Sequence, residues 1–217
     1  MLLSIDPPLS FYTPAFYSYS IMNRTILPYQ ENPALREVAA EIPLADIGSP
    51  FVRELIADMK HLLAQEKFGV AIAASQVGEA VRLFVVSGKA LDKHSDDDED
   101  EDGEGDDEEK KKVAKKKKQH TPDQIYINPV MVKMSRGKKL KHEGCLSVKG
   151  KWGHVLRAEK ATVRAYDEHG VAFTRGASGF LAHVFQHEMD HLDAILYIDK
   201  AKKLFDDKPE QDEQNEH

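Results

Sequence analysis

Two stretches of the chain place apolar residues at the spacing of an amphipathic helix. Residues 50–67 follow a candidate N-cap, Ser49, and one face of this stretch carries Phe51, Leu55, Ile56, Met59, Leu62 and Leu63. Ser178 and Gly179 offer a second helix start, and the apolar stripe that follows is formed by Phe180, Leu181, Val184, Phe185 and Leu192. The pattern therefore predicts one helix in the first half of the chain and one near its C-terminal end.

Strand-like segments lie between the two predicted helices. Residues 81–86 and 124–134 are rich in β-branched and other apolar residues, and we expect a strand in each. Apolar and polar residues alternate in 162–166 and again in 171–173, and turn residues occupy 167–170, which predicts a β-hairpin. A helix, a group of strands and a final helix, in this order, indicate an α+β fold.

Composition limits the class of protein. The chain has 217 residues, of which 41% are hydrophobic and 31% are charged, enough for one well-buried domain, which we place at 22–205. No stretch approaches the roughly 20 apolar residues of a membrane span, so we expect no membrane partner.

The first 21 residues differ from the rest of the chain. They lack a basic start followed by an apolar run, and they contain no arginine, which argues against a secretory signal and a mitochondrial transit peptide. We expect residues 1–21 to be a disordered extension, or an upstream misassigned start that precedes Met22. The expected location is accordingly a bacterial-type cytoplasm rather than an organelle.

Two further segments concentrate charge. Positions 96–109 hold twelve acidic residues and two glycines, and seven lysines fall within the nine positions that follow. Such blocks of like charge cannot bury a core, so we expect residues 96–118 to form a disordered insertion in the domain. The alternative is an interaction tether for ribosomal RNA or a basic protein, because runs of lysine attract phosphates, although the adjacent acidic block would compete for the same lysines.

Charge outside these segments has the opposite sign. The insertion contributes −5, an acidic tail at 206–217 contributes −5 and residues 1–21 contribute −1 to the total of −7, so the rest of the chain carries +4. A mildly basic core is compatible with transient contact with the ribosome. No specific nucleic-acid partner is expected.

Two histidines with helical spacing form the strongest chemical signal. His187 and His191 lie four residues apart, and Glu188 comes directly after the first. In a helix the two imidazoles project from one face and can chelate one metal ion, with the carboxylate beside them as a proton carrier. The alternative is a pair of ordinary histidines on a helix flank, which would strand polar nitrogens beside the apolar stripe. The pattern therefore favours a metal site.

The chain has a single cysteine, Cys145, so it forms no intramolecular disulfide, which suits a reducing compartment. A lone cysteine is ordinarily a small buried hydrophobe. Here it follows Glu143 and Gly144 at the expected end of a strand. A thiolate and two imidazoles make three ligands and leave a fourth position for water, as in catalytic metal sites. This ligand set suits zinc, iron, cobalt and nickel alike.

Three separated blocks resemble those of the peptide deformylases, metal hydrolases that remove the formyl group from the N-terminal formyl-methionine of new bacterial and organellar proteins. The blocks are Gly-Val-Ala-Ile-Ala-Ala-Ser-Gln at 69–76, Glu-Gly-Cys-Leu-Ser at 143–147 and His-Glu-Met-Asp-His at 187–191. The resemblance covers roughly residues 22–90 and 121–200. It implies an α+β fold in which small mixed or antiparallel sheets surround a C-terminal metal-binding helix.

The resemblance also implies a role for each motif residue. Glu188 would be the general acid and base. The side-chain amide of Gln76 and the backbone N–H of Leu146 would stabilise negative charge on the formyl oxygen. The implied cofactor is one divalent ion, Fe²⁺ in the cell, with Zn²⁺, Ni²⁺ or Co²⁺ as replacements. The implied metal ligands are Cys145, His187 and His191.

The implied substrate is an N-formylmethionyl nascent peptide whose backbone lies along residues 69–73. The residues that would contact it are Val70, Ala71, Glu143, Gly144, His183 and Val184. Some positions depart from the family pattern, namely Ala71, Ser75, Lys149 and Ala194. Because Ala71 replaces a second glycine of the first block, its methyl group is expected to tilt the bound peptide or narrow the methionine pocket.

Two other functions have to be weighed against this hydrolase. A zincin-type metallopeptidase shares the His-Glu-x-x-His pattern, but its third ligand comes downstream, and only acidic tail residues are suitable after His191. A catalytically weak relative that acts by binding would be expected to lose Glu188, Gln76 or Cys145, and all of them are present. The sequence therefore favours the deformylase interpretation.

Overall fold

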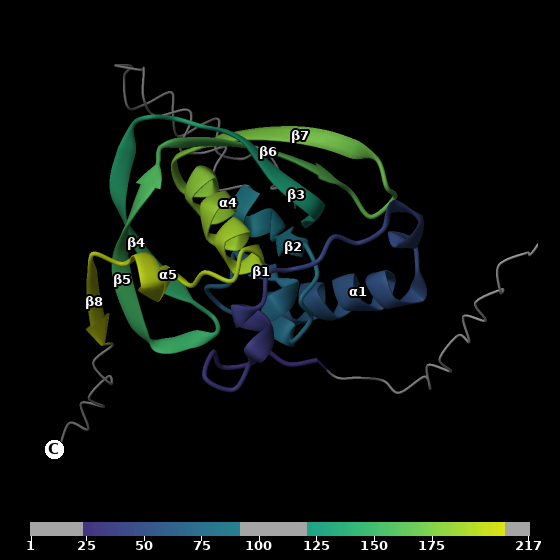
Figure 1. The fold of residues 1–217 in the computed structure, drawn as a ribbon, viewed down its shortest axis with the longest axis horizontal. Helices are drawn as coiled ribbons and strands as arrows, with labels where there is room; N and C mark the ends of the chain where they lie inside the picture. The colour runs from purple at the N-terminus through teal and green to yellow at the C-terminus, as the bar shows by residue number, and fades with distance from the viewer. Residues whose placement is uncertain (1–23, 92–120, 207–217) are drawn as a thin grey trace, which may run out of the picture.

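The computed structural model of the protein describes residues 24–91 and 121–206. In these ranges the chain forms two β-sheets, two longer helices and several short helical turns (Figure 1). The predicted extension at 1–21, the predicted insertion at 96–118 and residues 207–217 of the predicted tail lie outside the described residues.

The larger sheet has five strands in the order β1-β2-β3-β6-β7, and neighbouring strands are antiparallel. The strands expected at 81–86 and 124–134 are confirmed, and so is the hairpin, in which Tyr166 pairs with Ala172. The bounds are β1 Ala71–Ala73, β2 Leu83–Val86, β3 Gln124–Met134, β6 Lys160–Tyr166 and β7 Ala172–Ser178.

The smaller sheet has three strands in the order β4-β5-β8, again antiparallel. Cys145 ends β4, as the sequence predicts. Asp206, which the sequence analysis assigned to the tail, is the last residue of β8 and pairs with Lys151 of β5 in register and through an ion pair. The bounds are β4 Lys138–Cys145, β5 Val148–Ala158 and β8 Lys203–Asp206.

Helix α1, Pro50–Gln65, matches the first predicted helix. Its N-cap is Ser49, whose hydroxyl accepts a hydrogen bond from the backbone N–H of Val52 at 3.3 Å. The apolar face of α1 packs against one side of the larger sheet in a cluster that includes Leu55, Ile56, Met59, Ile72, Leu83, Val85 and Ile125. Short turns complete this part of the chain, namely η1 Pro33–Arg36, η2 Leu44–Asp46 and η3 Ala74–Val77.

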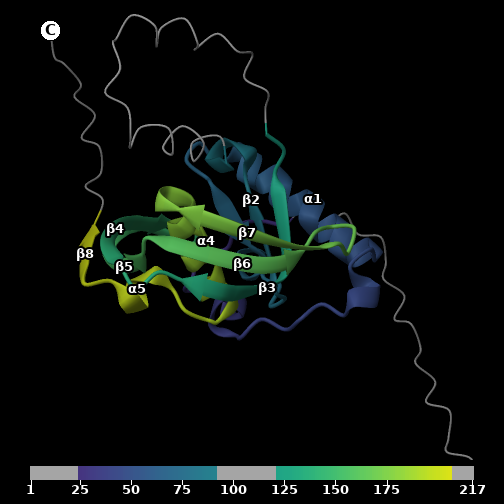
Figure 2. The same cartoon turned by 90° about the horizontal axis from the view of Figure 1, so that it is seen from above.

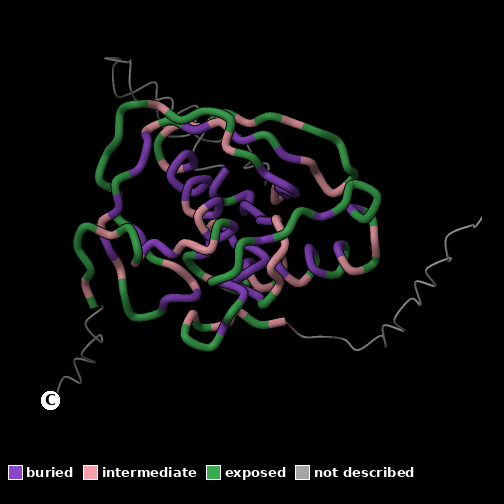
Figure 3. Tube along the Cα trace, in the orientation of Figure 1, coloured by how far each residue is buried: buried purple, intermediate pink, exposed green. Residues whose placement is uncertain are grey.

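Helix α4, Gly179–Leu192, starts after Ser178 as predicted and contacts strands of both sheets. The two views show it near the centre of the molecule, with β6 and β7 passing over one side (Figures 1 and 2). Its apolar stripe packs on the opposite side of the larger sheet from α1, in a cluster with Phe84, Val86, Tyr126, Leu181, Phe185 and Leu192. Figure 3 shows that most of α4 is buried.

The arrangement confirms the predicted α+β fold, with small sheets around the C-terminal helix. After α4 the chain forms the short helix α5, Tyr197–Lys200, before it enters β8. Among the described residues, none of the helices combines the length and the apolar character that spanning a membrane requires.

Candidate metal centre

Helix α4 places the two histidines of the motif on one side. His187 and His191 lie one turn apart, and their ring centroids are 4.9 Å apart. Burial lowers the pKa of His191 well below its usual range. Its imidazole is therefore neutral, which is the form that binds metals.

The end of β4 brings Cys145 to the same place. Its Sγ lies 3.3 Å from Nε2 of His191, and the ligand atoms of Cys145, His187 and His191 all lie within 4.8 Å of one another. Two of these residues are partly exposed and His191 is buried. A thiol and two imidazoles at this separation have the donor chemistry and spacing to hold one divalent ion.

The carboxyl group of Glu188 lies beside this group on the buried side of α4. Its Oε2 atom is buried and has no hydrogen-bond partner among the described residues. Burial raises the pKa of Glu188 to about 7, even though the neighbouring His187 lowers it. An unpaired carboxyl with a pKa near neutrality can both accept and donate a proton.

The carboxylate of Glu143 orients one of the two imidazoles. Its Oε2 atom lies 2.9 Å from Nδ1 of His187, whose imidazole also contacts the thiol of Cys145. Burial would raise the pKa of Glu143, but hydrogen bonds from Arg157, His183 and His187 outweigh this effect and hold the pKa below its usual range. An ionised carboxylate behind a ligand imidazole is a common device for fixing its tautomer and orientation.

A chain of charged groups extends from this carboxylate. Arg157 donates to Glu143 through Nε at 2.6 Å and through a terminal nitrogen at 2.9 Å, and both side chains are at most 3% exposed. The other terminal nitrogen of Arg157 donates to Asp190 at 2.6 Å, and Asp190 also accepts from Lys200 at 2.8 Å. The network therefore joins β4 and β5 to α4 directly behind the candidate metal ligands.

Gln76 approaches the group from the η3 turn. Its Oε1 atom accepts a hydrogen bond from the backbone N–H of Ala73 at 2.8 Å, which fixes the amide plane. Its Nε2 atom lies 3.5 Å from Sγ of Cys145 and 3.4 Å from Oγ of Ser147. Leu146 occupies the turn between β4 and β5 next to the cysteine. Both groups predicted to stabilise an oxyanion thus lie beside the candidate ligands.

The residues expected to contact a substrate have different surroundings. Gly144 is exposed and Val70 is partly buried, whereas Val184 is buried in the core. Ala71 is 6% exposed and belongs to the core cluster around α4. The side chain of Glu143 is 1% exposed and is held by protein partners, so it is not free to contact a substrate.

The comparisons with known proteins agree with this geometry. Residues 23–206 match the family described as polypeptide deformylase. The chain belongs to this family. The match confirms the resemblance that the three sequence blocks indicate, and it includes every residue of the candidate metal centre.

Individual deformylases are similar over most of the chain. Peptide deformylase 1A, chloroplastic/mitochondrial, of Arabidopsis thaliana is 34% identical over 169 residues, which are 78% of this chain and 58% of that protein. A peptide deformylase of Pelodictyon phaeoclathratiforme is 33% identical over 161 residues, 74% of this chain and 71% of that protein. The relatives therefore include both a bacterial and an organellar deformylase.

Solved deformylase structures share the fold. The Met-Ala-Ser-bound crystal structure of a class I type b peptide deformylase from Acinetobacter baumannii superposes with a TM-score of 0.62 and 25% sequence identity, covering 82% of this chain and 97% of that one. The arrangement of two sheets around α4 is accordingly that of a deformylase.

Sequence reasoning missed the charged network behind the ligands. The sequence patterns did not single out Arg157, and Asp190 entered only as one residue of the 187–191 block. One feature of the sequence could have indicated a buried ion pair: Arg157 is a charged residue between apolar neighbours in a strand-like segment. Such a residue needs a buried partner of opposite charge, but the sequence does not say which one.

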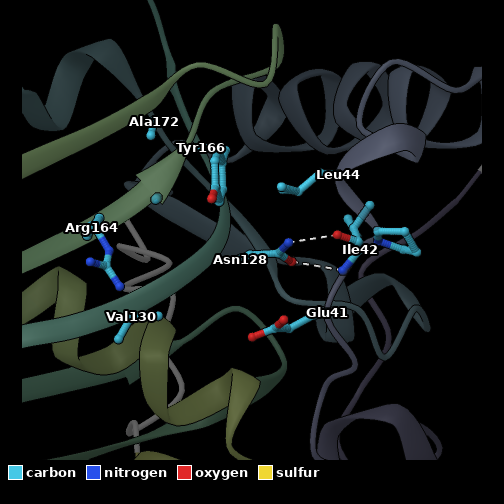
Figure 4. Close-up of a pocket in the computed structure, with 10 residues that line it drawn as sticks. Glu41, Ile42, Leu44, Asn128, Val130, Arg164, Tyr166 and Ala172 are labelled. Atoms are coloured by element: carbon cyan, nitrogen blue, oxygen red, sulfur yellow. Dashed lines mark hydrogen bonds between the residues drawn. The ribbon is translucent and has the colours of Figure 1, made fainter.

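A separate cavity of about 490 Å³ lies between the 41–44 segment and strands β3 and β6 (Figure 4). The amide of Asn128 sits in its wall and bonds to both backbone groups of Ile42, at 2.8 and 2.7 Å. Asn128 also has a φ of 48°, a conformation that asparagine tolerates better than most residues. Through these contacts Asn128 has a structural role, because it connects the 41–44 segment to β3.

Proposed function

We propose that this protein is a metal-dependent hydrolase that removes the formyl group from the N-terminal formyl-methionine of newly synthesised proteins. The observation that carries the proposal is the grouping of Cys145, His187 and His191 within 4.8 Å, beside the buried and unpaired carboxyl of Glu188. Three protein ligands that leave one position for water, with a neighbouring proton carrier, are an arrangement that can hydrolyse an amide at neutral pH.

The metal centre would hold one divalent ion, Fe²⁺ in the cell, with Zn²⁺, Ni²⁺ or Co²⁺ as replacements that the same ligands accept. A bound divalent ion would supply a nucleophile, because it lowers the pKa of water from 15.7 to about 7. The protein would hold the ion through Sγ of Cys145 and through one ring nitrogen of each histidine. Metal analysis of protein purified without oxygen tests this assignment, since a thiolate-bound ferrous site is sensitive to oxidation.

The remaining residues would act on the substrate. Glu188 would accept a proton during attack and donate it to the departing amine. The amide of Gln76, held by the backbone of Ala73, and the backbone N–H of Leu146 would donate hydrogen bonds to the formyl oxygen as it gains negative charge. Because these donors are fixed beforehand, they would lower the barrier to reaction more than they strengthen substrate binding.

The substrate would be a peptide that starts with formyl-methionine. The structure of the Acinetobacter relative with bound Met-Ala-Ser supports this choice. Val70, Ala71, Gly144 and Val184 would contact the peptide by their side chains or backbone, and Glu143 by its backbone alone.

The decisive experiment measures formate release from formyl-Met-Ala-Ser by the metal-loaded protein, with unformylated Met-Ala-Ser as the control. Release of formate without cleavage of either peptide bond is the expected result. Cleavage of the unformylated peptide would instead indicate a metallopeptidase. The geometry already disfavours a zincin arrangement, because the third ligand in the described residues, Cys145, comes from upstream of the helix.

We also propose that the enzyme acts in a bacterial-type cytoplasm and contacts ribosomes only transiently. The net charge of +4 outside the charged appendages supports weak attraction to ribosomal RNA. Co-sedimentation with ribosomes should then fall steeply between about 50 and 200 mM salt, the range in which phosphate contacts weaken. Retention that does not depend on salt would contradict this form of contact.

A further inference from the structure

Helix α4 carries a third histidine at the same spacing. His183, His187 and His191 follow one another at intervals of four residues, so all of them project from similar sides of the helix. Only the last two belong to the metal group. His183 is 9% exposed, and its Nε2 atom lies 2.9 Å from Oε1 of Glu143.

This contact completes the coordination of the Glu143 carboxylate. Oε1 receives Nε of Arg157 at 2.6 Å and Nε2 of His183 at 2.9 Å. Oε2 receives a terminal nitrogen of Arg157 at 2.9 Å and Nδ1 of His187 at 2.9 Å. A carboxylate offers about four acceptor sites, so all of them are used by these three side chains.

The two ligand imidazoles are therefore supported differently. Nδ1 of His187 is held by the saturated carboxylate, whereas Nδ1 of His191 is buried and has no hydrogen-bond partner among the described residues. Any movement of the Glu143 carboxylate would therefore change the orientation of the His187 imidazole. Without His183, one oxygen of Glu143 would keep a single partner, and the carboxylate could rotate away from the plane that His187 requires.

We propose that His183 is a positioning residue, which fixes the carboxylate of Glu143 and through it the imidazole of His187. The inference rests on the proposed metal centre and adds a residue beyond its ligands. It differs from the substrate contact that the sequence resemblance implies for His183, because the Nε2 atom of this ring is used by Glu143.

The test compares His183→Leu, which removes the donor at similar volume, with His183→Gln, whose amide nitrogen can reach the position of Nε2. Co²⁺ is the probe, and its affinity for each metal-free protein is measured by competition with a chelator. His61→Leu is the matched control, because His61 also lies on a helix but is exposed and, among the described residues, bonds only to Gln65. Thermal unfolding of the metal-free proteins establishes that each variant folds, and His183→Ala replaces His183→Leu if the latter does not.

The expected result is an affinity for Co²⁺ about 10-fold weaker in His183→Leu, a changed Co²⁺ absorption spectrum, and recovery to within about 3-fold in His183→Gln. With saturating metal, kcat should fall while KM stays within about 2-fold, since the defect lies behind the ligands. Unchanged affinity and spectrum in His183→Leu would overturn the inference, as would a rise in KM alone, which would assign His183 to the substrate pocket. Failure of the parent protein to bind Co²⁺ would instead contradict the proposed metal centre itself.

Discussion

Among single residues, Cys145 and Glu188 separate metal binding from chemistry. Cys145→Ser should lose the metal, because an alcohol ionises far less readily than a thiol and is a poor ligand. Glu188→Gln should keep the metal, since the ligand atoms are untouched, but its kcat should fall about 10²–10⁴-fold through loss of proton transfer. Metal content per chain and kcat on formyl-Met-Ala-Ser measure the two effects. Equal metal loss in both variants would refute the division of roles.

Arg157 tests how far the buried network stabilises the fold. Arg157→Leu leaves the carboxylate of Glu143 buried without its cationic partner, so the free energy of unfolding should drop by about 3–5 kcal/mol. Arg36→Leu is the control, because Arg36 and Asp199 form an ion pair in which both side chains are at least 39% exposed. Its loss should cost at most about 1 kcal/mol. Urea denaturation of the metal-free proteins compares them, and equal costs would show that burial of the pair is energetically unimportant.

At the scale of elements, the backbone at the end of α4 explains why the family frequently has glycine at the position that Ala194 occupies here. Ala194 follows the C-cap Asp193 and has a φ of 62°, a left-handed conformation that favours glycine. Ala194→Gly should therefore stabilise the protein by about 0.5–1 kcal/mol. Ala201→Gly is the matched control. Ala201 has a φ of −62°, so this substitution should lower the stability of the protein by about the same amount. A thermal midpoint that falls in both variants would contradict strain at Ala194.

The elements that could be predicted from the sequence are those formed by interactions between residues close together in the chain. The starts of α1 and α4 depend on a cap and an apolar stripe within a few residues, and both were read from the sequence. The partners of Glu143 lie 14, 40 and 44 positions away in the chain, and they meet only because β4 and β5 pair in one register and α4 docks behind them. Strand β8 has four residues, two of them charged, so it shows no alternation of apolar and polar residues from which a strand could be predicted.

The same distinction applies to the site. The candidate metal ligands and the candidate proton carrier are marked in the sequence by residue type and spacing. The structure brings the ligand atoms of Cys145, His187 and His191 within 4.8 Å of one another. The side chains that orient the ligands carry no such mark. His183 shares the four-residue spacing of the ligands, yet its ring contacts Glu143 instead, which only the three-dimensional arrangement reveals.

At the scale of the whole molecule, the two ends of the gap between the described ranges are held together. Val86 of β2 pairs with Gln124 of β3, and the backbone N–H of Gly88 donates to the carboxylate of Asp123 at 3.0 Å. An added Cβ at Gly88 would lie 1.6 Å from the carbonyl oxygen of Thr121, so the two backbones approach closely. The core clusters on both sides of the larger sheet are built from the described residues that flank this gap.

Deleting residues 96–118 and joining the ends through a short turn should therefore leave kcat and KM on small formylated peptides within a few-fold of the parent values. The flanks are already fixed by the β2–β3 pairing, and shortening a long connection changes its closure entropy by only about 0.6 kcal/mol for each halving. Kinetics at matched metal content measure the effect, and an equally long Gly/Ser replacement separates the influence of charge from that of length. A collapse of kcat in the deletion variant, with normal activity in the Gly/Ser variant, would show that the length of the segment supports the site. A collapse in both variants would show that its charges do.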